Sequence, residues 1–117
     1  MKTATLALAL LLGTAGTTFA QDHSGHHGSH GATGASAEYM DAMQRMDEAM
    51  KSMAMTGKAG IDFAEMMIPH HQAAIDMAKS YLASDENDPE LTKLSNDIVA
   101  AQEREIAQLK EWIARNK

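Results

Sequence analysis

Residues 61–83 read IDFAEMMIPHHQAAIDMAKSYLA, and this stretch decides the fold. Its apolar and small residues fall into two adjacent stripes at helical spacing, and most of the other positions are polar. The first stripe consists of Phe63, Met67, His70, Ala74, Met77 and Tyr81, and the second of Ala64, Ile68, His71, Ile75, Ala78 and Leu82. An apolar face this wide predicts a helix covered on two sides, with His70 and His71 in the middle of the covered face. Pro69 should bend this helix, because it removes one backbone hydrogen bond.

A Met-rich helix is predicted before this stretch. Residues 38–55 contain no Pro, no Gly and no β-branched residue. Helical spacing joins five of them into one stripe, namely Tyr39, Met43, Met46, Met50 and Met53. Gly57 and Gly60 then end the helix and form a turn.

A third helix is predicted over residues 89–115. Asp88 is a good N-cap, and Pro89 suits the first helical position. The apolar stripe of this helix has an amide at its centre and consists of Leu91, Leu94, Ile98, Gln102, Ile106, Leu109 and Ile113. Trp112 is expected to pack near the C-terminal end.

These helices, at about residues 38–55, 61–83 and 89–115, predict one all-α domain over residues 38–117. Short turns make neighbouring helices antiparallel, so the fold class is an antiparallel bundle of three long helices. A second copy of the chain could complete this bundle by dimerising. Counting outward from the two turns places Met46 and Gln102 opposite His70, and Glu105 opposite Met67. We therefore expect polar and sulfur-containing residues of all three helices to meet at one level.

Residues 1–20 are typical of a secretory signal peptide. Lys2 is followed by an apolar run over residues 4–12, and small residues lead up to Ala20, where cleavage is expected. The apolar run is too short to anchor the chain in a bilayer. The sequence therefore predicts a periplasmic or secreted bacterial protein that keeps no membrane anchor after processing.

Residues 21–37 form a His-, Gly- and Ser-rich tail, which is predicted to be disordered because it has too little apolar surface to bury. The tail carries four imidazoles that suit copper(II), nickel(II) or zinc(II), at His23, His26, His27 and His30. After cleavage at Ala20, the new amino terminus, two backbone amides and His23 would also form a square-planar copper(II) site. The alternative interpretation is a hydrophilic spacer without a metal role.

Composition narrows the function further. The chain has 117 residues and a formal net charge of −6, which argues against nucleic acid as a partner. It has no cysteine, so disulfide scaffolds and thiolate metal sites are excluded. It has no Glu-x-x-His pair, no His-Glu-x-x-His run and no Gly-rich phosphate loop, so no enzyme class is indicated. Its 10 Met and 6 His residues instead indicate that the chain binds metal ions.

Two Met–His pairs have a spacing of four, which brings the side chains over one another on a helix: Met66 with His70, and Met67 with His71. A thioether beside an imidazole suits copper(I), or silver(I), whose preferences are similar. Further sulfur ligands could come from the preceding helix, from Met43, Met46 and Met50. Gln102 or Glu105 could orient a histidine ring by accepting its hydrogen bond.

A Met stripe is also typical of an ordinary helical core. Residues 38–60, however, contain no Leu, Ile, Val or Phe, although Leu would specify a core better. The all-Met face therefore favours either metal ligands or a flexible surface that binds a protein partner or a hydrophobic ligand. A copper-dependent redox enzyme is a third interpretation.

Two segments, residues 63–78 and 102–112, resemble a family of small secreted bacterial proteins known as a domain of unknown function, which includes the CopM-like copper-binding proteins. The similarity covers about residues 38–113. It implies a ferritin-like helical bundle, a periplasmic or extracellular location, and copper or silver binding linked to metal tolerance. The ligand character of the family falls on Met66, Met67, His70, His71 and Met77, whereas Leu109 stands where members often carry Met. The resemblance and the residues together predict sequestration of copper, or its hand-off to another periplasmic copper protein, and no catalysis.

Overall fold

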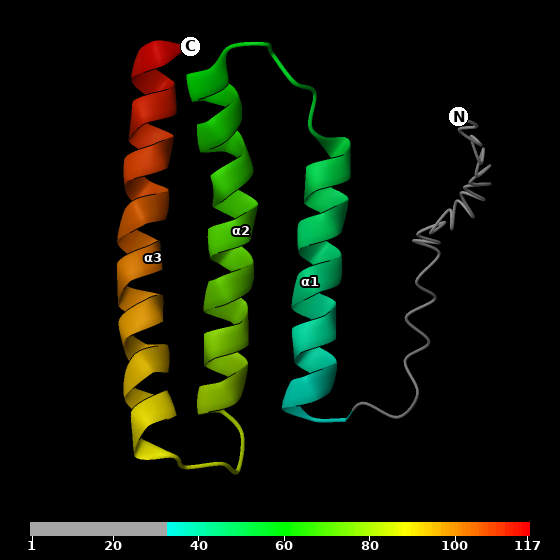
Figure 1. The fold of residues 1–117 in the computed structure, drawn as a ribbon, viewed down its shortest axis with the longest axis vertical. Helices are drawn as coiled ribbons and strands as arrows, with labels where there is room; N and C mark the ends of the chain where they lie inside the picture. Colours follow the sequence, from blue (N-terminus) through cyan, green and yellow to red (C-terminus); the bar gives the residue numbers. More distant parts are fainter. Residues whose placement is uncertain (1–32) are drawn as a thin grey trace, which may run out of the picture.

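A computed structural model of the chain describes residues 33–117. The predicted signal peptide and the four tail histidines, at positions 23, 26, 27 and 30, lie outside the described residues. Three helices make up the described part, and no strand occurs in it. Helix α1 spans Ala35–Ser52, α2 spans Ala59–Leu82 and α3 spans Pro89–Asn116 (Figure 1). The all-α prediction is confirmed, and each helix begins and ends within three residues of its predicted bounds.

The turn between α1 and α2 is held by the carboxylate of Asp62, near the start of α2. The backbone N–H and the hydroxyl of Thr56 donate to Asp62 Oδ1 over 2.8 and 2.6 Å, and the N–H of Gly57 donates to Asp62 Oδ2 over 3.0 Å. Gly57 has a φ of 78°, which a residue with a side chain adopts only with strain. The chain leaves the helical conformation at Met53, so α1 ends three residues earlier than predicted.

Helix α3 begins, after the turn that follows α2, at the residues that the sequence predicts. The Asp88 side chain accepts a hydrogen bond from the Leu91 N–H over 2.9 Å, which satisfies one of the free donors at the start of α3. Pro89 occupies the first helical position, as predicted.

Helix α2 lies between the other two helices, and all three run side by side in a single layer (Figure 1). Both α1 and α3 pack against α2, while within residues 33–117 they make no contact with one another. The prediction that α2 is covered on two sides is therefore correct. The layer is not closed into a four-helix arrangement, so the ferritin-like bundle stays a prediction.

The core of the layer consists mostly of small side chains, which let the helix backbones approach closely. The buried apolar residues are Ala42 on α1, Ile61, Ala64, Ala73, Ile75 and Ala78 on α2, and Ile106 on α3. At the start of α2, a Cβ added to Gly60 would lie 2.8 Å from Cη2 of Trp112. Trp112 therefore packs directly on the α2 backbone. None of the helices in this part of the chain is long and apolar enough to cross a membrane.

Candidate metal centre

The two adjacent histidines of α2 lie in different surroundings. His71 is buried, with 7% of its surface exposed, whereas His70 is exposed. Both were expected on the covered face, and for His70 that expectation is wrong. Successive residues on a helix point about 100° apart, so a neighbouring helix that covers one of them can leave the other in solvent.

The physical reason for this difference is the side of α2 that α1 covers. Ala73 belongs to neither predicted stripe, yet it is buried. Three residues further on, Asp76 accepts a hydrogen bond from Arg45 of α1 over 3.1 Å. Helix α1 therefore packs on the Ala73 side of α2. The stripe from Phe63 to Tyr81, which includes His70, is left in the opening between α1 and α3.

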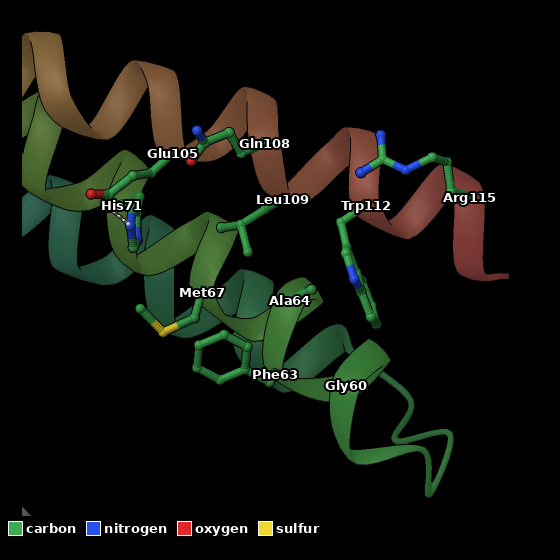
Figure 2. A pocket seen from close by; sticks show the side chains of 10 residues that line it. All are labelled: Gly60, Phe63, Ala64, Met67, His71, Glu105, Gln108, Leu109, Trp112 and Arg115. Atoms are coloured by element: carbon green, nitrogen blue, oxygen red, sulfur yellow. Dashed lines mark hydrogen bonds and ion pairs between the residues drawn. The ribbon is translucent and has the colours of Figure 1, made fainter.

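The buried histidine is bonded to the third helix. His71 Nε2 lies 2.5 Å from Glu105 Oε2 (Figure 2). Glu105 was expected opposite Met67, and the structure places it one helical turn further along α2. Since a carboxylate can only accept, Nε2 carries a proton, and in the neutral ring Nδ1 holds the lone pair that a metal would use.

This pair lies at one end of a groove of about 530 Å³ between α2 and α3. Figure 2 shows Phe63 and Met67 on the α2 side of the groove, and Leu109 and Trp112 reaching in from α3. The complete lining is Gly60, Phe63, Ala64, Met67 and His71 from α2, and Glu105, Gln108, Leu109, Trp112 and Arg115 from α3. Sequence reasoning did not find this groove, although the register that it derived puts Gly60 level with Trp112.

The predicted sulfur ligands are distributed over two helices. Met66, Met67 and Met77 on α2 are partly buried, as are Met46 and Met50 on α1, while Met43 is exposed. Because α1 and α3 lie on opposite sides of α2, the Met residues of α1 and the polar residues of α3 do not enclose a common centre. Within residues 33–117, no three His, Asp or Glu side chains are grouped so that they could hold a metal ion.

Gln102 was predicted to orient a histidine, and it stands one turn before Glu105 on α3. Its Oε1 is buried and has no hydrogen-bond partner. A buried amide oxygen without a donor is costly, so this atom is a free acceptor inside the helix layer.

Comparison with known protein families identifies the chain. The model of a family described as "Domain of unknown function (DUF305)" matches residues 8–113. The chain belongs to the DUF305 family. The match ends at the residue where the sequence resemblance ended, and it begins 30 residues earlier, so it includes residues before the first described one. A search of proteins with curated functions gave no match for this DUF305 protein.

Proposed function

We propose that this DUF305 protein binds copper(I) through His and Met side chains of α2 and sequesters it or hands it on, without catalysing a reaction. The observation that carries the proposal is the exposure of His70 in a helical face rich in sulfur. Met66 and Met67 precede His70 by four and three residues, and Met77 follows it by seven, so all three share its side of α2. Thioether and imidazole ligands select copper(I) over the harder divalent ions, and silver(I) has the same preference.

The exposure of His70 favours transfer over permanent storage. In a single chain, a metal held at this accessible imidazole can be approached by a ligand of a second molecule, another copy of the chain included, before the first bond breaks. His71 offers a more enclosed position, because Glu105 holds its ring in place beside Met67 and the groove. The two histidines would then differ in affinity, with the exposed one loading and releasing metal.

The proposal includes the parts of the chain that precede residue 33. A signal peptide over residues 1–20 would send the protein to the periplasm or the exterior. There the histidines of the tail would capture copper(II), and the helices would hold copper(I) as part of metal tolerance. A CopM-like role and hand-off to another periplasmic copper protein belong to the same proposal.

An anaerobic copper(I) competition titration with a coloured chelator tests this function. The protein is the processed chain from residue 21, with its four tail histidines replaced by Ala so that only the helices are measured. His70→Ala and His71→Ala are compared with Gln72→Ala, an exposed neighbour on the same helix. We expect the wild-type helices to compete with the chelator and the His70 variant to lose affinity by about tenfold or more. The Gln72 variant should bind as the wild type does.

A second function is favoured by a different observation, namely the exposure of Phe63 at the groove and of Met43 on α1. Apolar side chains in solvent suit a module that binds a protein partner or a hydrophobic ligand. If the wild-type helices do not compete with the chelator, copper binding by the helices is wrong and the interaction module is the better explanation. If they compete and neither histidine replacement changes the competition, His70 and His71 are not the ligands.

A further inference from the structure

The two faces of the helix layer differ in charge. Besides the His71–Glu105 contact, three ion pairs within residues 33–117 join α2 to its neighbours, and all three use one side of α2: Arg45–Asp76 at 3.1 Å, Lys79–Glu103 at 3.2 Å and Lys117–Glu65 at 2.7 Å. The stripe from Phe63 to Tyr81 lies about half a turn round the helix from these charged positions. Helix α2 therefore presents a charged face on one side of the layer and an uncharged face on the other.

The flanking helices continue this face with apolar side chains, while Asp47 on α1 and Arg115 on α3 add charges beside them. On α1, Met43 lies two residues from Arg45 and so on the opposite side of that helix from the ion pairs. On α3, Trp112 shares the groove with Phe63, and Leu94 precedes Trp112 by 18 residues, which is five full helical turns. We call this surface the open face, and it comprises Met43, the α2 stripe from Phe63 to Tyr81, and Leu91, Leu94 and Trp112.

The open face leaves much apolar surface in water. Its exposed members are Phe63 at 62%, Leu94 at 51%, Leu91 at 46%, Met43 at 41% and Trp112 at 37%. Each leaves roughly 100 Å² of side chain accessible, so the five expose about 500 Å², which is already as large as the biggest apolar patch on a typical monomer. With His70 and the partly buried Met67, Met77 and Tyr81, the area approaches the roughly 800 Å² that each partner contributes to a stable interface.

The charges on the open face favour a second copy of the chain as the occupant. The α2 stripe carries no Asp, Glu, Lys or Arg. Glu105, at the edge of the groove, is bonded to His71 of the same chain. The α2 stripes of two copies can therefore face each other without like charges meeting, although the whole chain is strongly acidic. A different protein with a basic surface would find few acidic side chains on the open face to pair with.

The position of His70 gives this pairing a chemical consequence. A symmetric pair buries a face about a two-fold axis, and residues near the axis meet their own copies. Centred overlap of two such layers puts the axis near the middle of α2, and His70 is at the midpoint of this 24-residue helix. We infer that a second copy covers the open face, so that His70 and Met67 of both copies form one shared soft-metal centre. This inference rests on the proposed function.

Sedimentation equilibrium of the processed chain, under anaerobic conditions with and without one copper(I) per two chains, tests the inference. We expect a dimer that copper(I) tightens by about tenfold or more. Phe63→Glu should give a monomer, because it places a charge in the interface, while far-UV circular dichroism stays helical. Gln72→Glu adds the same charge on an exposed site outside the open face and should leave the dimer intact. The His70→Ala variant should still dimerise without copper(I), but copper(I) should no longer tighten its dimer.

Chelator competition on the same samples separates the possible failures. A wild-type chain that stays monomeric under both conditions overturns the inference, and the open face is then covered by another occupant, such as the chain's own residues before position 33. Tight copper binding with an unchanged dimer constant also overturns the shared centre, but it leaves the proposed function standing. A dimer that binds no copper overturns both the proposed function and the shared centre.

Discussion

The imidazole of His71 is held by the carboxylate of Glu105, and the 2.5 Å contact joins α2 to α3 across the helix layer. The contact fixes the proton on Nε2, since the carboxylate cannot donate one. We expect ¹⁵N–¹H correlation spectra of the imidazoles at neutral pH to show His71 as the Nε2–H tautomer. His70 of the same protein serves as the internal comparison, because it is exposed. A spectrum with the proton on Nδ1 of His71 would contradict the contact.

Replacement of Glu105 tests whether this bond contributes to metal affinity. Partners that orient a ligating histidine change metal affinity by about 10–100-fold in other proteins. We expect Glu105→Ala to weaken the tighter part of the copper(I) titration by a factor in this range. Glu103→Ala, which removes an exposed carboxylate two residues away, is the matched control. Equal titrations for the two variants would exclude a role for Glu105.

Asp62 predicts a pH dependence of stability. Hydrogen bonds from the Thr56 hydroxyl, the Thr56 N–H and the Gly57 N–H lower the pKa of this carboxyl below its ordinary value. A carboxyl whose pKa is lower in the folded chain contributes stability above its unfolded pKa, about 4, and loses that contribution as the pH falls through the folded pKa. We expect the Tm of the wild type to fall over this acidic window, and Asp62→Asn to flatten the fall. Asp47→Asn, at an exposed site on α1, should keep the wild-type slope.

Gly60 predicts a local rearrangement that fluorescence can detect. A methyl group at this position would lie 2.8 Å from Cη2 of Trp112, so the indole must move. Since Trp112 is the single tryptophan, we expect Gly60→Ala to shift its emission to longer wavelength as the ring turns toward water. Gly57→Ala is the control. It has open space around its new methyl but a φ of 78°, so it should cost about 1 kcal/mol without changing the emission.

The burial of Ala73 indicates that α1 approaches α2 closely at this position. This residue is buried although it lies outside both apolar stripes. We expect Ala73→Leu to lower the free energy of unfolding in urea by about 1–3 kcal/mol, because the larger side chain overfills the contact. Ala74→Leu changes the adjacent position on the open face, where there is more room, and should cost less than about 1 kcal/mol. Equal effects at both positions would mean that α1 covers a different side of α2.

The helix pattern could be predicted from the sequence because its signals are local. Asp88 and Pro89 begin α3 as their backbone preferences require, and the two stripes of α2 correctly predict that the helix is covered twice. The side on which each neighbour packs could not be predicted, because periodicity gives the angular position of a residue and does not say which helix lies over it. Helix α1 packs over Ala73, and His70 therefore lies in solvent. The His71–Glu105 bond lies one turn from the position that counting predicted for Glu105, although Gly60 and Trp112 meet where the same count places them.

The single-layer arrangement has a further consequence for how the molecule comes apart. Within residues 33–117, helix α1 packs against α2 alone, so its detachment removes none of the packing between α2 and α3. Subglobal opening of this kind would expose the amides of α1 to hydrogen exchange while those around His71 and Glu105 stay protected. The chain would then behave as a stable hairpin of α2 and α3, with α1 as a hinged arm that carries methionines. The rate at which α1 detaches could be measured separately from the rate at which α2 and α3 unfold.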